Sequence, residues 1–257
     1  MGGMKIKYIY NKDKRTEKFF KLIKNKFPEI LDEKNPDIYL VSGGDGAMLH
    51  AIHESIEGNI PYFGKALGTF NFLMNKIEDD EKVIKGILDG SIKLEYYTSN
   101  AIAVYLDKVK IGEAVNEIVL GESIMGYSTF NITTEHGDFK DFEVKGSGIC
   151  ISTSIGSTAF NFNNGGRILP LDSDLLSITG IVCNRYLNDI IKCQEVALHS
   201  NGAKIFLSNI DSGVLNKGQK LILKKGKSIK IGFLDKNSFL QRRIEIANRY
   251  RSNGCGT

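Results

Sequence analysis

The stretch Asp37-Ile38-Tyr39-Leu40-Val41-Ser42-Gly43-Gly44-Asp45-Gly46 decides the fold of this 257-residue chain. Its apolar residues predict a buried β-strand that ends in a glycine-rich turn, and apolar residues at helical spacing follow from Ala47 to Ile56. Backbone N–H groups of such a turn, backed by the start of a helix, attract phosphate oxygens. The stretch therefore predicts a phosphate-binding turn between a strand and a helix.

The predicted turn carries one carboxylate, that of Asp45. A carboxylate repels phosphate oxygens unless it binds a metal ion or takes a proton from a hydroxyl group. Asp45 is therefore the first candidate catalytic residue. The alternative is a structural turn in which Asp45 caps the helix, and the turn alone does not distinguish the two interpretations.

Composition limits the class of protein. With 42% hydrophobic residues the chain can bury one large core or two modest ones, and we expect two small domains. The 34 Lys and Arg residues nearly balance the 30 Asp and Glu residues and are spread along the chain, so no nucleic-acid surface is predicted. The small positive excess suits a polyanionic small molecule, although many ordinary cytosolic proteins share it.

Neither a metal site made by the chain itself nor a membrane segment is predicted. The four cysteines form no CxxC pair, the four histidines form no HExxH motif, and His50 and His53 have no third donor nearby. No run approaches the roughly 20 apolar residues that span a bilayer, and the first residues lack the apolar core of a signal peptide. We therefore expect a cytoplasmic protein with free thiols.

Two patterns of secondary structure divide the chain. Strands at 5–10, 37–41 and 60–64 alternate with helices at 16–27, 47–56 and 78–88, which predicts an α/β domain over residues 1–92, a parallel sheet with flanking helices. Ligands bind beyond the carboxyl ends of the strands in such sheets, which is where the Gly43 turn lies. Residues 93–236 predict a mostly β, sandwich-like domain, and residues 237–257 predict a helix that packs back on the first domain. The strands expected in the second domain are 94–97, 102–106, 130–134, 142–145, 149–153, 204–207, 221–223 and 229–233.

Two further segments carry candidate binding residues. Asn116 and Glu117 form a polar pair in the apolar run Ala114 to Ile118, where a ligand with hydroxyl and amine groups would satisfy them, although a turn or a satisfied edge is the commoner reason for such a pair. The second segment runs from Gly146 to Phe160 and is followed by Gly165-Gly166. Its strand leads into a Gly-Ser-Thr-Ala turn whose small residues admit a close ligand and whose hydroxyls supply donors.

Together these motifs resemble those of the NAD kinase family, ATP-dependent enzymes that phosphorylate NAD to NADP. The GGDG loop of the family matches Gly43-Gly44-Asp45-Gly46, its NE dipeptide matches Asn116-Glu117, and its T-P-x-G-S-T-A-Y segment matches the residues from Thr153 to Phe160. The three motifs occur in the family order and the resemblance spans nearly the whole chain. GGDG by itself is shared with lipid kinases and phosphofructokinases, whereas the other two motifs together are far more selective.

The resemblance implies a role for each matched residue. Asp45 would be the general base for the adenosine ribose 2′-hydroxyl of NAD, and Gly43, Gly44 and Gly46 would form the phosphate loop. Mg²⁺ or another divalent cation would arrive with ATP, because one carboxylate cannot supply a metal cage. The residues implied to bind NAD are Asp45, Gly46, His50, Asn116, Glu117, Lys145, Ser147, Thr158, Ala159, Phe160, Asn163 and Val182.

Several positions depart from the family pattern. Ser147 replaces the aspartate of a G-D-G sequence, and Lys145 keeps a basic residue just before it. His50 stands where many members have Arg or Lys, and Phe160 replaces the usual Tyr. Ala66 and Asn71 replace an Asn and a Gly of the loop after the third strand.

Three functions follow as hypotheses. The first is an ATP:NAD 2′-phosphotransferase that acts on small molecules and forms a homodimer or homotetramer, as related bacterial enzymes do. The second is a lipid kinase that shares the GGDG loop, which would favour an apolar or basic membrane-facing surface that the sequence lacks. The third is a non-catalytic dinucleotide-binding or sensing protein of the same fold, against which the presence of Asp45 and the Asn116-Glu117 pair argues.

Overall fold

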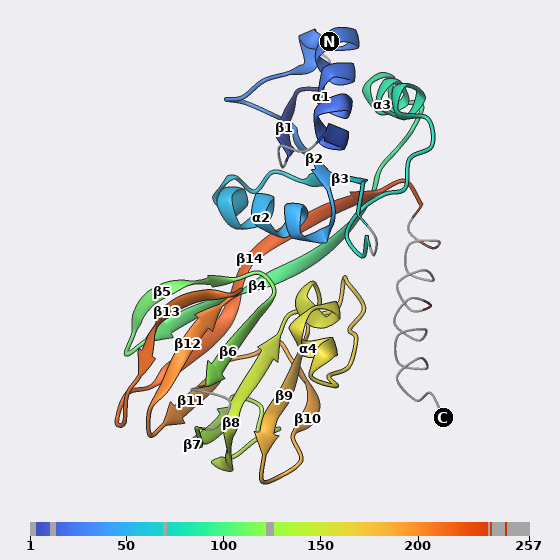
Figure 1. Cartoon of the computed structure of the whole chain (residues 1–257). Helices are drawn as coiled ribbons and strands as arrows, with labels where there is room; N and C mark the ends of the chain where they lie inside the picture. The colour runs from blue at the N-terminus through green and yellow to red at the C-terminus, as the bar shows by residue number, and fades with distance from the viewer. Residues whose placement is uncertain are drawn as a thin grey trace. The chain divides into compact units, whose positions relative to one another are not determined.

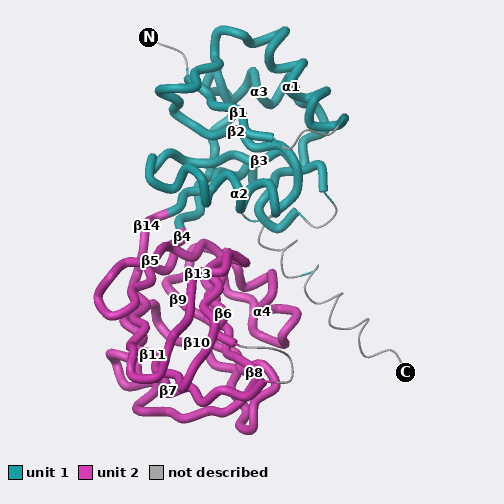
Figure 2. Tube along the Cα trace, turned by 60° about the vertical axis from the view of Figure 1, so that its left-hand side comes forward, with its two compact units in different colours: residues 1–98, 229–257 teal, residues 99–228 magenta. Residues whose placement is uncertain are grey.

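The structure is a computed structural model that describes residues 4–10, 14–68, 71–121, 126–235, 237 and 245. The chain divides into two compact units, coloured separately in Figure 2. Unit 1 comprises Met1–Thr98 and Ile229–Thr257, and unit 2 comprises Ser99–Ser228. Two long strands, β4 (Glu95–Leu106) and β14 (Leu221–Phe233), begin in one unit and end in the other.

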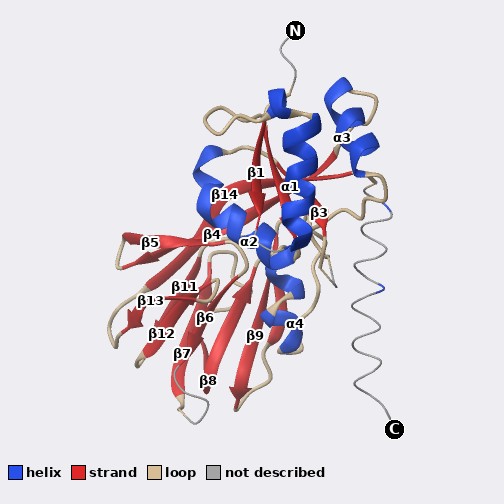
Figure 3. Ribbon diagram, turned by 45° about the horizontal axis from the view of Figure 1, so that its top comes forward, coloured by secondary structure: helices blue, strands red, loops and turns tan. Residues whose placement is uncertain are grey.

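Unit 1 is a parallel sheet in the order β1-β2-β3-β14, drawn with its helices in Figures 1 and 3. The alternation of strand and helix explains the parallel pairing, because each helix returns the chain to the edge at which the next strand begins. The predicted helix-flanked α/β sheet is confirmed. Besides parts of β4 and β14, its elements are β1 Ile6–Tyr10, α1 Lys14–Lys26, η1 Pro28–Ile30, β2 Ile38–Gly43, α2 Asp45–Ser55, η2 Ile56–Gly58, β3 Tyr62–Ala66 and α3 Asp80–Asp89.

Helices cover both faces of this sheet. Ile23 of α1 and Ile84 of α3 share one core cluster with Leu40 of β2, so these two helices lie on the same face. Val41 points to the opposite face because side chains alternate along a strand. On that side Met48 of α2 reaches the backbone of Gly64, where a Cβ would lie 2.7 Å from its methyl carbon. Strand β2 is therefore buried on both faces, as its unbroken apolar run predicts.

Unit 2 is mainly antiparallel, with β11-β7-β8-β6-β12-β13 in sequence across the sheet, β9 and β10 continuing from β8, and β5 paired with β4. The expected predominance of strands is confirmed. Its elements are β5 Val109–Ala114, β6 Glu117–Gly121, β7 Ser128–Thr134, β8 Phe142–Ser152, η3 Gly156–Thr158, α4 Phe160–Asn163, β9 Leu175–Cys183, β10 Asn188–Lys192, β11 Val196–Ser200, β12 Ala203–Leu207 and β13 Ile210–Leu215.

The central strands of unit 2 present two different faces. Ile118, Ile151 and Ile178 are paired across β6, β8 and β9 and belong to the apolar core. The next row along these strands, Glu117, Ser152 and Ser177, points to the other face because side chains alternate. Small polar side chains therefore line the face that carries Glu117.

The strands of unit 2 differ from the sequence-based expectations, which did not include β5, β9, β10, β11 and β13. The separate strands expected at 94–97 and 102–106 are one strand, β4, and the same holds for 142–145 with 149–153 in β8 and for 221–223 with 229–233 in β14. The residues between each pair, such as Gly146 and Gly226, are extended despite their turn-like composition. Asn116 and Glu117 do not lie inside one strand, since β5 ends at Ala114 and β6 begins at Glu117. The expected helix over 237–257 lies almost entirely outside the described residues, so its packing stays a prediction.

Candidate active site

The glycine turn of unit 1 is shaped by steric limits. Gly43 ends β2 with φ of +147°, and a Cβ at this position would lie 2.7 Å from the Ala47 Cβ. Gly44 occupies the N-cap position of α2, where the backbone is extended and no side chain caps the helix. The turn therefore connects β2 to α2 through two residues that have no side chain to cover the backbone.

Asp45 is the first residue of α2 and is half-buried. Its Oδ1 atom accepts a hydrogen bond of 2.8 Å from the backbone N–H of Leu73. The N-cap position of α2 is occupied by Gly44, so Asp45 is the first helical residue and not the N-cap residue. The carboxylate instead lies at the positive end of the α2 dipole and is held by the segment that follows β3.

The segment that follows β3 packs directly on the glycine turn. The Leu67 N–H donates to the Gly43 carbonyl oxygen at 2.7 Å. Gly68 approaches Gly44 so closely that a Cβ on Gly68 would lie 2.9 Å from the Gly44 Cα. Three successive residues of the turn, Gly43, Gly44 and Asp45, are therefore each held by a contact with the segment after β3.

His50 and Gly46 are both exposed on α2. They lie four residues apart, so they share one side of the helix. The His50 Nε2 atom is 3.8 Å from Glu54 Oε1, with both side chains more than half exposed, so the pair is weak. Both residues are therefore accessible to a ligand that approaches the start of α2.

In unit 2, Asn116 and Glu117 are buried with unsatisfied oxygens. Their exposed fractions are 7% and 2%, and Asn116 Oδ1 and Glu117 Oε2 have no hydrogen-bond partner among the described residues. Burial raises the pKa of Glu117 to about 7. Buried polar atoms of this kind are costly unless a ligand satisfies them, so the pair has the character of a binding site.

The backbone around Asn116 is tightly held. The Val115 and Asn116 N–H groups both donate to Ser208 Oγ at 3.1 Å. The Thr153 N–H donates to the Asn116 carbonyl oxygen at 2.9 Å, and a Cβ on Gly156 would lie 2.2 Å from that oxygen. The NE pair and the Gly-Ser-Thr-Ala turn are far apart in the chain but therefore meet in one place.

The Gly-Ser-Thr-Ala turn leads into α4 through a network of buried amide and hydroxyl groups. Asn161 is fully buried, and its Nδ2 donates to the carbonyl oxygens of Ser157 and Arg167 at 3.1 and 3.0 Å. Its Oδ1 accepts from Ser177 Oγ at 3.0 Å, in the same cross-strand row as Glu117. This network fixes the four candidate residues at the start and end of α4: Thr158 and Ala159 are half-buried, whereas Phe160 and Asn163 are exposed.

Lys145, Ser147 and Val182 lie farther along the sheet. Ser147 is five residues before Ser152 on β8, which is roughly 17 Å from the Glu117 row. Val182 of β9 lies between the pairs Gly146–Cys183 and Gly148–Ile181, so it is opposite Ser147. Ser147 is buried, while Lys145 and Val182 are exposed. The structure therefore does not gather all candidate residues of unit 2 at one point but spreads them along β8.

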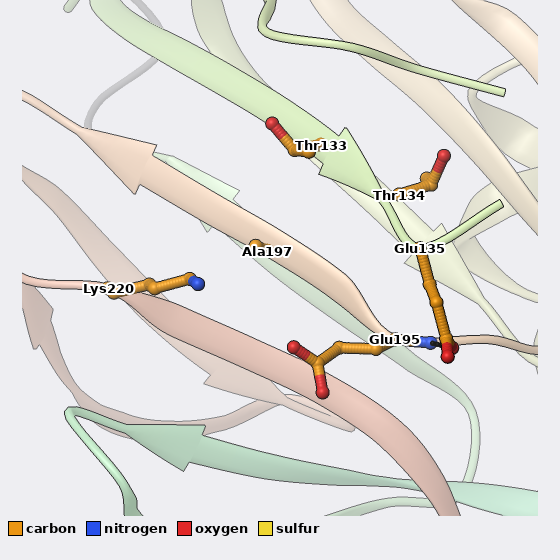
Figure 4. A pocket seen from close by; sticks show the side chains of 6 residues that line it. All are labelled: Thr133, Thr134, Glu135, Glu195, Ala197 and Lys220. Carbon is orange, nitrogen blue, oxygen red and sulfur yellow. Dashed lines mark hydrogen bonds between the residues drawn. The ribbon is translucent and has the colours of Figure 1, made fainter. Parts of the chain in front are cut away.

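A separate cavity of about 250 Å³ lies in unit 2. Figure 4 shows the carboxylates of Glu135 and Glu195 among its lining side chains, and Glu195 also forms an ion pair of 2.9 Å with Lys224. Two carboxylates disfavour a phosphate-bearing ligand. None of the candidate site residues is among those that line it, which are Thr133, Thr134, Glu135, Glu195, Ala197 and Lys220.

Sequence reasoning missed three groups that hold the candidate residues: the Leu73 N–H, the Ser208 hydroxyl and the Thr153 side chain, whose Oγ1 donates to the Val115 carbonyl oxygen at 2.7 Å. Leu73 acts through its backbone and Ser208 belongs to a distant turn, so neither gives a sequence signal. Thr153 begins the quoted motif and could have been singled out.

Within the described ranges, no group of three or more His, Cys, Asp or Glu side chains could hold a metal ion. Within the same ranges no helix is long and apolar enough to cross a bilayer.

Comparisons with known proteins agree on one family. The NAD kinase of Rickettsia bellii (strain OSU 85-389) is 32% identical over 186 residues, which cover 70% of each chain. The crystal structure of yeast NADH kinase complexed with NADH has a TM-score of 0.79 at 16% identity and covers 96% of this chain and 88% of that one. An NAD kinase from Archaeoglobus fulgidus in complex with ATP has a TM-score of 0.73 at 17% identity, over 95% of this chain and 99% of that one. No protein-family model matches the chain.

The two solved structures establish the fold, and the identity to the Rickettsia protein over most of both chains establishes the family. The lipid-kinase and non-catalytic alternatives are not favoured by these relatives. The chain belongs to the NAD kinase family, the ATP-dependent enzymes that phosphorylate NAD to NADP.

Proposed function

We propose that Asp45 is the general base of this NAD kinase and takes the proton of the adenosine ribose 2′-hydroxyl of NAD. The observation that carries the proposal is the position of its carboxylate, at the end of the phosphate loop and held by the Leu73 N–H at 2.8 Å. A carboxylate beside a phosphate loop is unfavourable unless it meets a proton or a cation. The acceptor hydroxyl supplies that proton.

In this scheme the 2′-oxygen attacks the γ-phosphorus of ATP while its proton passes to the Asp45 carboxylate. The bond from the γ-phosphorus to the bridging oxygen breaks, and ADP leaves with the electron pair. The backbone of Gly43, Gly44 and Gly46 lies beside the start of α2 and suits the phosphate groups. Positioning and charge neutralisation supply most of the catalysis in such transfers.

The divalent cation, Mg²⁺ in our proposal, enters as part of the ATP complex. Asp45 already accepts a hydrogen bond from Leu73, so the turn offers one engaged carboxylate and not a cage of oxygen ligands. The chelated cation neutralises charge on the transferred phosphoryl group. The chain itself orients the acceptor hydroxyl and receives its proton.

We assign the adenosine part of NAD to the polar groups of unit 2. Asn116 Oδ1 and Glu117 Oε2 would accept hydrogen bonds from hydroxyl or amine groups of NAD, since among the described residues they have no partner. Thr158 and Ala159, with Phe160 beside them, would line the adenine pocket, as the motif implies, and Asn163 would contact NAD as well. Ser147, with Lys145 just before it, would lie near the nicotinamide end, Val182 would lie near the nucleotide, and His50 would lie near the phosphates.

The substitution Asp45→Asn tests the assignment. It keeps the shape and the acceptor for the Leu73 N–H but removes the base, so we expect kcat to fall by about 10²- to 10⁴-fold with NAD binding kept. Turnover is measured as NADP formed from NAD and Mg·ATP, and NAD binding by calorimetry. Unchanged turnover would refute Asp45 as the base.

Asp37→Asn is a matched control. Asp37 precedes β2 at its opposite end, is exposed, and accepts one backbone hydrogen bond of 2.7 Å, from the Lys5 N–H. The control therefore removes a carboxylate with similar local bonding away from the glycine turn. We expect its kcat to stay within about twofold of the unmodified protein.

The same assay separates the other hypotheses. A non-catalytic sensor would bind NAD without forming NADP, and a lipid kinase would use ATP only with a lipid acceptor. Assembly as a homodimer or homotetramer and cytoplasmic residence stay predictions. Light scattering of the purified protein tests the first, and fractionation of the cells that make it tests the second.

A further inference from the structure

The carboxylate of Asp45 depends on a segment that is itself fixed by one buried side chain. Leu73, whose N–H holds Asp45 Oδ1, is two residues before Asn75. The side chain of Asn75 is 6% exposed, and its hydrogen bonds to Gly64, Gly232 and Leu234 lie within unit 1. A buried amide in this position requires partners for all its donors and acceptors.

Asn75 satisfies this requirement by joining its own segment to β3 and to the end of β14. Its Nδ2 donates to the carbonyl oxygens of Gly64 in β3 and Gly232 in β14, at 3.2 and 3.0 Å. Its Oδ1 accepts from the Leu234 N–H at 2.9 Å. The Asn75 backbone adds two more bonds, from its N–H to the Gly64 oxygen and from the Ala66 N–H to its own oxygen, both of 2.8 Å.

These five bonds fix the end of the segment that packs on the glycine turn. The segment leaves β3 at Ala66 and returns to it at Asn75, which forms a parallel bridge with Lys65. Between these two points lies Leu73, and Met74 fills the space above Gly64 with its sulfur 2.5 Å from where a Cβ would be. A shift of the Asn75 backbone would therefore carry the Leu73 N–H away from Asp45.

The chemistry of an amide matches these partners and that of an acid does not. Two carbonyl oxygens require two donors, and one N–H requires an acceptor, which is the inventory of a single asparagine. An ionised aspartate at this position would face both carbonyl oxygens with no donor. The partners around residue 75 therefore require the two donors and one acceptor of an asparagine amide, and a side chain of the same size without them would not replace it.

We infer that Asn75 is the positioning residue for Asp45: its amide fixes the Leu73 N–H against the Asp45 carboxylate and so sets the direction from which the base meets the acceptor hydroxyl. The inference rests on the proposed role of Asp45. Asn75 itself touches neither the turn nor a substrate in this scheme. Its effect is on the rate of the chemical step and not on NAD binding.

The test is a double-mutant cycle between Asn75→Ala and Asp45→Asn in the full chain. Misplacing a reacting group by about 1 Å costs up to about 10²-fold, so we expect Asn75→Ala to lower kcat about 10- to 100-fold with the KM for NAD within about twofold. In the Asp45→Asn background the same change should lower the residual turnover by less than about twofold. A purely structural role would lower both by the same factor.

Two outcomes of the cycle overturn the inference while leaving the proposed function intact: an unchanged kcat in Asn75→Ala, and an equal fold loss in both backgrounds. Failure of the proposed function is read separately, from Asp45→Asn alone. Ile84→Ala, a core truncation in α3 outside the segment, controls for general destabilisation and should keep the kcat of the folded protein.

A second variant and a second measurement cover loss of folding in Asn75→Ala. Asn75→Ser keeps one donor and one acceptor, and it should lower kcat less than alanine does. Hydrogen exchange of the Leu73 amide in the unmodified protein needs no variant. Protection of that amide supports the inference, and exchange at the rate of an unprotected loop amide overturns it.

Discussion

Replacement of Glu117 by glutamine tests what burial does to this carboxyl group. Burial raises the pKa of Glu117 from its usual 4.5 to about 7, and the side chain is 2% exposed. In the unfolded chain the group is in water and keeps its usual pKa. The rise in pKa from 4.5 to about 7 corresponds to a loss of roughly 3 kcal/mol in the free energy of unfolding once the group is ionised, at about 1.4 kcal/mol for each tenfold change in proton affinity.

The sign follows from which state holds the proton. Between pH 4.5 and about 7 the folded protein keeps the proton on Glu117 and the unfolded chain has lost it. Stability is therefore highest below pH 4.5, falls through this interval and is level above it. Glutamine is neutral at every pH, so it resembles the protonated acid and has no such loss.

We expect Glu117→Gln to match the unmodified protein in the free energy of unfolding near pH 4.5. At pH 8 the variant should be more stable by up to about 3 kcal/mol. Urea unfolding followed by circular dichroism at several pH values measures the difference. An equal difference at all pH values, or a less stable variant at pH 8, would refute the reasoning. Glu33→Gln, at an exposed acid, should change stability by less than about 1 kcal/mol throughout.

Three further predictions concern fixed backbone and charge positions. Gly156→Ala places a Cβ 2.2 Å from the Asn116 oxygen, so it should destabilise unit 2 by about 1–3 kcal/mol and weaken NAD binding in calorimetry. Val182 has φ of +48°, which a β-branched residue tolerates poorly; Val182→Asn should raise stability by about 1 kcal/mol in thermal unfolding, and a lower melting temperature would contradict this. Asp80→Ala leaves the Lys65 ammonium, with 9% side-chain exposure, without its ion-pair partner and should cost about 3 kcal/mol in urea unfolding.

The fold of unit 1 could be predicted because the spacing of apolar residues changes at the points where strands give way to helices. The unbroken apolar run of β2, the glycines after it and the helical spacing of Ala47, Met48 and Ile52 all point to the same arrangement. Each local preference agrees with the parallel sheet that tertiary packing requires. The position of Asp45 at the end of this strand followed from the same pattern.

The strands of unit 2 were harder to predict. Gly146 and Gly148 in β8 look like a turn in sequence, yet they are extended because β6 and β9 leave no room for side chains there: a Cβ on Gly148 would lie 2.5 Å from the Leu120 oxygen. Such close approach between backbones is a property of the assembled sheet. The composition of a short stretch of sequence does not predict such close approach.

The residues of the candidate site were predicted from motifs, and the structure adds the groups that hold them in place. Asp45, Asn116 and Glu117 were predicted, but the groups that hold them were not. The Leu73 N–H is a backbone donor common to every residue except proline, and Ser208 reaches Asn116 from 92 residues away. Contacts of this kind depend on long-range packing, so no window of sequence around the motif reveals them.

The approach of Gly68 to Gly44 has a consequence for how tolerant this chain is to random substitution. A side chain at position 68 would meet the Gly44 Cα at 2.9 Å, a backbone atom that cannot rotate aside. The glycine turn or the segment that packs on it would then have to shift. In a survey of all single substitutions, scored by growth that requires the kinase activity, we therefore expect residue 68 to be intolerant although glycine has no reactive side chain.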